Sequence, residues 1–176
     1  MKRKFNFSLV SLLTLTFLVF SLTNTLAQEK SKKQLKEERK LEKQKQTALL
    51  VDSKEFVFVA ETVSPQGGRT RNLTTNDYTV EFHPDLIKSD LPFFGRAYGG
   101  VGYGGDGGIK FEGKPKEFTI EKTKKAHEIK AEVKGENDTY TLLLTVYFDG
   151  NANLSINSNN RSHISYNGVI EMLPKK

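Results

Sequence analysis

The chemistry that this sequence suggests first is phosphate binding, in a glycine-rich run with aromatic neighbours. The run LPFFGRAYGGVGYGGDGGIKF, residues 91–111, holds eight of the chain's 14 glycines, and residues 100–105 match G-x-G-x-x-G. A phosphate-cradling loop of that pattern needs a strand before the glycines and a helix after them, because the helix N-terminus meets the phosphates. Here Leu91-Pro92 precedes the glycines and the strand-like GIKFEG follows them. We therefore reject nucleotide binding and expect no cofactor.

The same run carries side chains that suit recognition of a partner. Glycine lets the backbone approach a ligand closely, and loops rich in Tyr and Gly are adaptable binding elements. An arginine among rings stacks on one of them or donates to backbone carbonyls, and we expect this of Arg96. The alternative is a loop that packs its aromatic residues to plug one end of a sheet. If the protein has a binding surface, we expect it to comprise Phe93, Phe94, Arg96, Tyr98 and Tyr103.

Other catalytic and metal-binding patterns are missing from the sequence. The three histidines, at 83, 127 and 163, have no zinc-ligand spacing, and Asp106 is a single acid where a calcium loop needs several. There is no cysteine, which excludes thiol catalysis and disulfides, and no G-x-S-x-G elbow. We therefore select no catalytic residue and no metal site. A hydrolase that uses two carboxylates in a sheet cleft stays open, because acids from different strands can meet in space.

The basic net charge of the chain, +6, does not indicate a nucleic-acid-binding protein. Three cations lie in the first four residues, and residues 28–47 carry a net charge of +4. The remaining residues, 48–176, carry a net charge of −1. A nucleic-acid-binding domain is expected to carry a basic patch of its own. We therefore expect no nucleic-acid partner.

The chain is predicted to have three parts. Residues 1–27 combine a Lys2-Arg3-Lys4 start, an apolar stretch and Thr25-Leu26-Ala27, which together are typical of a secretory signal peptide. The apolar stretch has about 12 residues, short of the roughly 20 that span a bilayer, so we expect no transmembrane anchor after cleavage. Residues 28–49 are predicted to form a charged helical leader or tether, and residues 50–176 a single β-rich domain. The predicted location is periplasmic or extracellular.

The domain that must position the aromatic run is predicted to be mainly β. Strand-like runs occur at 55–62, 78–82, 108–113, 116–122, 127–133, 139–148, 151–159 and 161–173. The run 55–62 has apolar residues on both faces, which is typical of a central strand, and most of the later runs place apolar residues on one face, which is typical of antiparallel sheets with one solvated face. No strand–helix–strand alternation occurs, so a doubly wound fold is excluded. The prediction is an α+β chain: one N-terminal helix, then an antiparallel meander or half-barrel of about seven or eight strands.

Three local predictions concern the connections. Residues 83–95 are expected to be irregular with at most one helical turn, and Asp149-Gly150 to form a two-residue type I′ hairpin turn. Lys122, Lys124 and Lys125 are expected to lie at a solvated hairpin tip. Asn167-Gly168 is either a second tight hairpin or a bulge in one long strand.

Several of these segments resemble an uncharacterised family. The segments FVFVAE, LPFFGRAY, GGIKF and RSHISYNGVI are similar to domain-of-unknown-function family 4251, secreted or lipid-anchored proteins of Bacteroidota. The resemblance covers about residues 50–173. It implies a cell-envelope setting and a β-rich fold, and no catalytic residues. Many similar proteins have a lipobox cysteine where this chain has Gln28, which favours a soluble exported form.

These observations lead to a hypothesis about function. The leading prediction is a secreted, non-enzymatic module that binds an unknown envelope protein or a small apolar ligand. The alternatives are a hydrolase that uses carboxylates in a sheet cleft and a structural spacer in which the leader matters more than the body.

Overall fold

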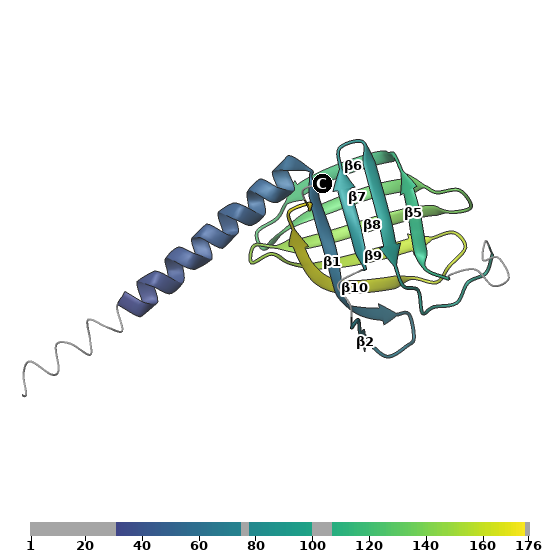
Figure 1. Ribbon diagram of the computed structural model, residues 1–176, viewed down its shortest axis with the longest axis horizontal. Helices are drawn as coiled ribbons and strands as arrows, with labels where there is room; N and C mark the ends of the chain where they lie inside the picture. Colours follow the sequence, from purple (N-terminus) through teal and green to yellow (C-terminus); the bar gives the residue numbers. More distant parts are fainter. Residues whose placement is uncertain (1–30, 75–77, 100–106, 175–176) are drawn as a thin grey trace, which may run out of the picture. The chain divides into compact units, whose positions relative to one another are not determined.

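The computed structural model describes residues 31–74, 78–99 and 107–174. In these residues the chain forms a helix, residues 31–53, and ten strands (Figure 1). The chain divides between Glu42 and Lys43 into two compact units, so the last part of the helix belongs to the unit that contains the strands. The predicted signal peptide, residues 1–27, lies outside the described residues. The strands are β1 (Phe56–Pro65), β2 (Arg71–Asn72), β3 (Thr79–His83), β4 (Leu86–Leu91), β5 (Ile109–Gly113), β6 (Pro115–Lys122), β7 (Ala126–Lys134), β8 (Thr139–Tyr147), β9 (Asn151–Ser158) and β10 (Ile164–Glu171).

The helix predicted for the leader is present and continues to residue 53. It contains neither glycine nor proline and is rich in Lys, Glu, Gln and Leu, which favour helix. It ends where Lys54 adopts the left-handed conformation, with φ of 58°, and its backbone N donates to Val51 O over 3.1 Å. Thr47 and Val51, one turn apart in the second unit, are 4% and 0% exposed. The end of the helix is therefore part of the domain core.

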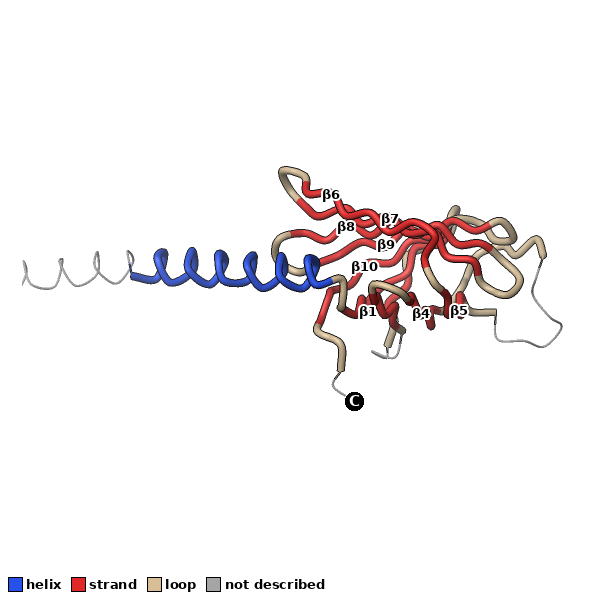
Figure 2. The backbone as a smooth tube through the Cα atoms, turned by 90° about the horizontal axis from the view of Figure 1, so that it is seen from above, coloured by secondary structure: helices blue, strands red, loops and turns tan. Residues whose placement is uncertain are grey.

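The strands form one antiparallel sheet in the order β5-β4-β3-β1-β10-β9-β8-β7-β6, with β2 paired to β1 beside this path. Figure 2 shows the sheet curled into two layers, β1, β4 and β5 in one and β6 to β10 in the other, and in Figure 1 the strands of the two layers cross steeply. No strand pairing joins β5 to β6 within the described chain. This architecture confirms the predicted class, a helix followed by an antiparallel half-barrel.

The hydrophobic core fills the space between the two layers. Every strand from β1 to β10 except β2 contributes inward side chains, and Phe56 of β1 stacks on Phe82 of β3 with ring centroids 4.8 Å apart. Phe111 of β5 stacks on Tyr140 of β8 at 4.4 Å, although the two strands are far apart in the sheet order. Such a ring pair between the layers stabilises their packing, because it contributes about 0.5–1.5 kcal/mol beyond the free energy gained by burying the two rings.

The sheet passes from one layer to the other at the pairing of β1 with β10. β1 pairs with β3 on one side and β10 on the other, as expected for a central strand with both faces apolar. Its register with β10 shifts between Ala60 and Thr62, where Glu61 is the extra residue of a bulge. Asn167-Gly168 is therefore no hairpin: β10 runs through it, opposite the bulge. A Cβ at Gly168 would collide with the Val59 carbonyl oxygen, so only glycine lets the two backbones approach this closely.

One prediction about the first layer was wrong. Residues 86–91 were expected to be irregular and instead form β4, which pairs with both β3 and β5. The inward positions of β4 are Ile87, Ser89 and Leu91. Because the middle one is a polar serine, the sequence does not show the alternation of apolar and polar residues that predicts a strand. Ser89 is 3% exposed and its hydroxyl donates to Ile109 O over 2.9 Å. With the two-residue β2, this strand accounts for the difference between ten strands and the predicted seven or eight.

The β8–β9 hairpin forms where Asp149-Gly150 predicted it, but not with a type I′ turn. Residues 148–150 make a three-residue loop, and of the Asp-Gly pair only Gly150 has a positive φ, +86°. Its backbone N donates to Tyr147 O over 2.9 Å. These features match a type I turn followed by a glycine in the left-handed region. The β6–β7 tip lies at residues 123–125, as predicted from its lysines.

Candidate functional site

The aromatic segment that follows β4 is held in place by its backbone. The buried Tyr166 hydroxyl donates to Pro92 O over 2.8 Å. Ala97 forms an isolated antiparallel bridge with Arg161. On either side of the bridge, Ser162 N donates to Arg96 O over 2.8 Å and Tyr98 N donates to Asn160 O over 2.7 Å. Residues 92–98 thus extend the sheet, because their backbone is hydrogen-bonded to residues 160–162, just before β10.

The two phenylalanines of this segment have different surroundings. Phe93 packs against the core and carries the Arg161 guanidinium over its ring, 5.1 Å from the centroid. Phe94 is 42% exposed and carries the Arg71 guanidinium, 4.8 Å from its centroid. Neighbouring residues in an extended chain point in opposite directions, so one ring anchors the segment and the other is displayed. Among the described residues, the arginines that lie over these two rings are Arg71 and Arg161 and not Arg96, of which we expected a ring contact or a bond to a carbonyl.

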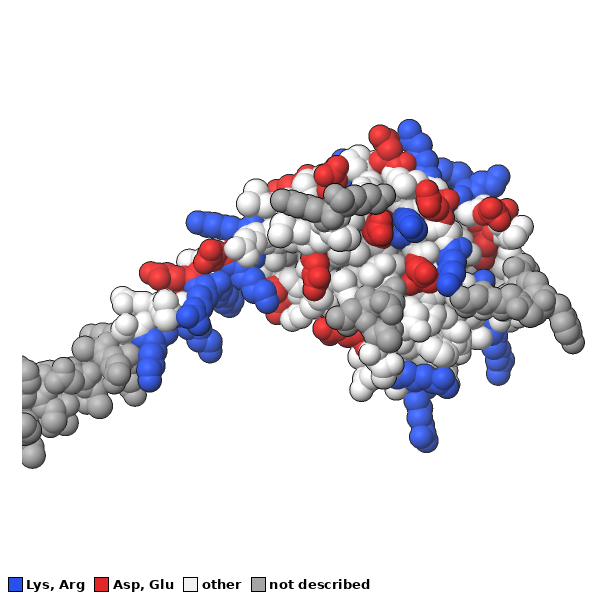
Figure 3. Space-filling view, viewed as in Figure 1, with Lys and Arg blue, Asp and Glu red and all other residues white. Residues whose placement is uncertain are grey.

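Phe94, Arg96 and Tyr98 line one open pocket of about 520 Å³ together with the β1–β2 loop, Pro65 to Gly68, and Ser162. Tyr98 is 73% exposed, the most exposed aromatic side chain among the described large hydrophobic residues. We call Arg71, Phe94, Arg96 and Tyr98 the arginine–aromatic surface. Figure 3 shows Lys and Arg side chains projecting from the lower edge of the body, where β2 lies in Figure 1.

Gly95 is required in the middle of this surface for steric reasons. A Cβ at this position would collide with the Ser162 hydroxyl and would lie 2.6 Å from the Phe93 ring. Ser162 Oγ is the acceptor for Arg96 N over 3.0 Å. The glycine in LPFFGRAY therefore serves close packing between two segments, and its φ is not positive.

Arg161 is the residue of this region that sequence reasoning missed. Its guanidinium donates to the carbonyls of Gly107 and Gly108 over 2.5 and 2.9 Å while it covers Phe93. It thereby ties the end of the glycine-rich run to the aromatic segment. Burial raises the pKa of the Tyr166 hydroxyl, and Arg161 acts in the opposite direction. The sequence signal was present, since Arg161 opens the RSHISYNGVI segment, but nothing in its spacing links it to residues more than 50 positions earlier.

A second, polar pocket of about 490 Å³ lies on the other side of Arg161. Two of its acids make contacts with protein groups: Asp90 Oδ1 lies 3.2 Å from Lys110 Nζ, and Asp138 Oδ1 accepts from Thr139 N and Asn159 N. The other oxygen of Asp138, Oδ2, is buried without a hydrogen-bond partner among the described residues. Within the described ranges no group of three His, Cys, Asp or Glu side chains could hold a metal ion. The pocket is lined by Lys88, Ser89, Asp90, Gly99, Lys110, Phe111, Glu112, Gly135, Glu136, Asn137, Asp138, Tyr140 and Arg161.

The structure thus brings together three of the five predicted binding residues. Phe94, Arg96 and Tyr98 share the arginine–aromatic surface, whereas Phe93 points away from it and packs against the core. Tyr103 lies outside the described residues. That these residues bind a partner stays a prediction.

The fold and the site define a class of protein: a curled antiparallel sheet with an N-terminal helix that displays a rigid aromatic segment at one end. The chain belongs to the family described as Domain of unknown function (DUF4251), whose model matches residues 38–170. This confirms the resemblance seen in the sequence.

A solved structure has a similar fold. It is the crystal structure of a DUF4251 family protein from Bacteroides eggerthii DSM 20697, with a TM-score of 0.58 and 20% identity. The match covers 74% of this chain and 87% of the Bacteroides chain. No match was found among curated proteins. In the part of the chain that the structure describes, no helix has the length and apolarity needed to span a membrane.

Proposed function

We propose that this protein is a secreted cell-envelope module that binds a protein partner through its arginine–aromatic surface. The observation that carries the proposal is the display of Phe94 and Tyr98, 42% and 73% exposed, on a segment whose backbone is hydrogen-bonded to residues 160–162. Burying these rings in a partner is favourable because they lose no further backbone freedom on binding. Tyr and Arg are also the residue types that dominate the energetics of protein interfaces.

A protein partner suits the domain better than a small apolar ligand. An apolar ligand would need a dry cavity, and the interior of the half-barrel is filled by fully buried side chains such as Phe56, Phe82 and Tyr166. The candidate pocket between the β1–β2 loop and residues 94–98 is open and lies beside Arg71. Cationic side chains beside exposed rings favour an acidic patch on the partner, because the charges steer the encounter.

The cell-envelope setting is part of the same proposal. The pattern of residues 1–27 supports export, residues 28–49 would act as a charged tether, and residues 50–176 would carry the binding surface. The location, periplasmic or extracellular, is proposed on this pattern.

The test is a binding comparison in which only the surface is changed. The double variant Phe94→Ala/Tyr98→Ala should lose at least about tenfold in retention of an envelope partner, because exposed aromatic hot spots carry much of an interface's energy. The control is Tyr147→Ala on β8, whose side chain is similarly exposed, 44%. Partners cross-linked in the native envelope are identified for the wild type and both variants, and urea unfolding checks that each is folded.

Retention that the double variant leaves unchanged would contradict the proposal. Loss of retention in Tyr147→Ala as well would also contradict it, because the two surfaces lie at different places on the domain.

A hydrolase is the second candidate, favoured by one observation. Four carboxylates, those of Asp90, Glu112, Glu136 and Asp138, line the polar pocket of about 490 Å³. Asp90 is paired with Lys110, whereas Asp138 uses only Oδ1 for its two backbone hydrogen bonds and its Oδ2 is buried without a partner among the described residues, which leaves Asp138, Glu112 and Glu136 for chemistry. A hydrolase would turn over a chromogenic glycoside and lose that turnover in Glu112→Gln or Glu136→Gln. Absence of turnover by the wild type across a panel of neutral and acidic glycosides would rule this candidate out.

A further inference from the structure

The first part of the helix, residues 31–42, carries its basic and acidic side chains on different sides. It belongs to the first compact unit, and all of its residues are exposed. At 3.6 residues per turn, its cations lie within about a third of the helix circumference and its acids lie outside that arc. Figure 3 shows most Lys and Arg side chains of the helix along its lower side and the acidic ones along its upper side. We call the cations of residues 31–42 the basic stripe, and they are Lys32, Lys33, Lys36, Arg39 and Lys40.

The charge of the basic stripe is not neutralised by the described part of the chain. The ion pairs between described residues all lie in the β-rich body, and none involves a cation of the stripe. Within the stripe, Lys36 has a lysine four residues before it and another four residues after it. Like charges at this spacing weaken a helix. An anionic surface laid along the stripe would remove that repulsion.

The shape of the basic stripe suits an extended anionic surface. Lys32, Lys36 and Arg39 follow one another at intervals of four and three residues, so they form a line about 10 Å long on the helix. A single small anion would contact one or two of these cations, whereas a flat surface contacts the whole line. The two leucines of this part, Leu35 and Leu41, lie on different sides of the helix and are 48% and 57% exposed. The helix therefore has no apolar face with which to embed in a bilayer, and its attraction would be electrostatic.

We propose that the basic stripe attaches the exported chain to the anionic surface of a lipid bilayer. This inference rests on the export proposed above and not on the arginine–aromatic surface. Lys32 is the fifth residue after the predicted signal peptide, residues 1–27, so the stripe follows the segment that export brings to a membrane. Residues 48–176 carry a net charge of −1, so the body does not offer a competing basic surface of comparable charge.

A bilayer suits the stripe better than an acidic protein does. Anionic headgroups diffuse in the plane of the membrane and gather wherever cations lie, and each basic residue close to such a surface is attracted to it. An acidic protein would need a fixed line of carboxylates that matches the spacing of the stripe. The arc that the stripe covers, about a third of the circumference, lets the helix lie flat with its acids turned away from the headgroups.

The test is co-sedimentation of the secreted, purified protein with lipid vesicles. Vesicles of phosphatidylcholine alone are compared with vesicles of equal parts phosphatidylcholine and phosphatidylglycerol, at low and high salt. We expect binding to the anionic vesicles alone and its loss at high salt, because salt screens exposed charges. Lys32→Gln/Lys36→Gln/Arg39→Gln should bind about a hundredfold more weakly, because each basic residue near an anionic bilayer contributes about fivefold.

A charge swap separates the stripe from the net charge of the protein. Lys36→Glu/Glu38→Lys keeps the composition and the net charge, but it puts an acid at the centre of the stripe and moves the cation to the opposite side of the helix. It should weaken binding about twentyfold, because the stripe loses one cation and gains one anion. Lys, Glu and Gln all favour helix, and circular dichroism confirms that each variant keeps its helix.

Two control variants test whether the rest of the protein contributes. Lys124→Gln/Lys125→Gln/Lys134→Gln removes as much charge as the triple stripe variant does, from exposed positions of the body, and should bind like the wild type. Phe94→Ala/Tyr98→Ala should do so as well. Its loss of partner retention is measured separately, so the failure of either proposal is visible without the other.

Four results would overturn the inference. The first is no binding to anionic vesicles, and the second is equal binding to neutral ones. The third is a charge swap that binds like the wild type, which would assign the attraction to net charge. The fourth is vesicle binding that depends on Phe94 and Tyr98 and not on the stripe, which would assign the lipid to the arginine–aromatic surface. Retention on immobilised polyglutamate without vesicle binding is a form of the first result and would assign the stripe to an acidic protein.

Discussion

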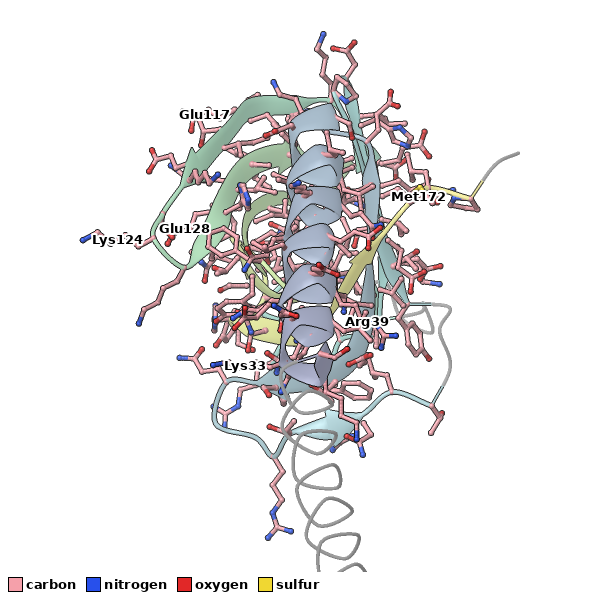
Figure 4. All side chains as sticks on the ribbon, turned by 90° about the vertical axis from the view of Figure 1, so that its left-hand side faces the viewer. Lys33, Arg39, Glu117, Lys124, Glu128 and Met172 are labelled. Carbon is pink, nitrogen blue, oxygen red and sulfur yellow. The ribbon has the colours of Figure 1, made fainter. Side chains whose placement is uncertain are left out.

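The outer surfaces of β6–β7 and of β8–β10 belong to one layer of one sheet, yet they meet solvent in different ways. On the first pair of strands four charged side chains form two cross-strand ion pairs, Lys116–Glu132 at 3.0 Å and Lys130–Glu117 at 3.6 Å. Figure 4 shows Glu117, Lys124 and Glu128 pointing away from the sheet into solvent. On β8 to β10 most outward positions hold Thr, Ser and Asn, and the others hold Leu143, Tyr147, Val169 and Glu171.

The position of β6 at the end of the sheet explains part of this difference. β6 is the last strand of the sheet, and its free edge would accept a strand from another molecule. Charged side chains and a proline near a sheet edge discourage such pairing, and β6 begins at Pro115. β7 has neighbours on both sides, and two of its charged side chains pair with charges on β6. The strands β8 to β10 also have neighbours on both sides and have no edge to protect.

The largest expected effect lies within the β8–β10 region, where β10 meets β1. Gly168→Ala should destabilise the domain by about 3 kcal/mol, because its Cβ would collide with the Val59 carbonyl oxygen and the bulge leaves the backbone no room to retreat. Urea unfolding measures the change in the free energy of unfolding. Gly107→Ala is the control, since a Cβ there meets nothing within 4 Å. A loss under 1 kcal/mol at Gly168 would show that the β1–β10 pairing can shift.

The second effect is a dependence of the free energy of unfolding on pH, caused by His127 on the inward side of β7. His127 of β7 is 3% exposed, edge-on to Phe148, and its Nε2 has no partner among the described residues. Burial, with Lys122 as a second cause, lowers its pKa, and Asp52 acts weakly in the opposite direction. The unfolded state then binds more protons than the folded state, so the free energy of unfolding falls as pH drops below about 6.5.

The pH dependence is measured by urea unfolding between pH 7.5 and 5.5. We expect the wild type to lose stability over this range, and His127→Leu to lose less. If the free energy of unfolding changed equally with pH in the two proteins, His127 would be protonated in the folded state as readily as in the unfolded state, which would contradict the prediction.

The smallest effect compares the two outer surfaces directly. Asn153→Asp should cost about 1 kcal/mol, because a carboxylate oxygen replaces the amide that donates to Asn167 Oδ1 over 2.8 Å. Glu117→Gln on β6 removes an exposed ion pair and should change the free energy of unfolding by less than about 0.5 kcal/mol. Both are measured at low and high salt. Equal costs would mean that the hydrogen bond between Asn153 and Asn167 contributes no more than the ion pair does.

Only part of the candidate site could be predicted from the pattern of residues in the sequence. The composition of LPFFGRAY predicted a binding segment, and three of its residues do line one pocket, although binding itself stays a prediction. The sequence did not show that Phe93 turns inward, because that depends on which face of the extended segment meets the core. Nor could it place Arg71 and Arg161 on the two rings, because these contacts join residues more than 20 and more than 60 positions apart.

The sequence by itself determined the helix, eight of the strands and the inward face of most of them, because alternation with a period of two and the absence of helix breakers are local properties. It could not determine β4, where a buried serine interrupts the apolar pattern, or the type of the β8–β9 turn, which depends on the backbone around Gly150. Only the tertiary structure decided that β10 lies between β1 and β9. That long-range pairing aligns the outward Thr, Ser and Asn residues into rows, because a row exists only once separate strands lie in register.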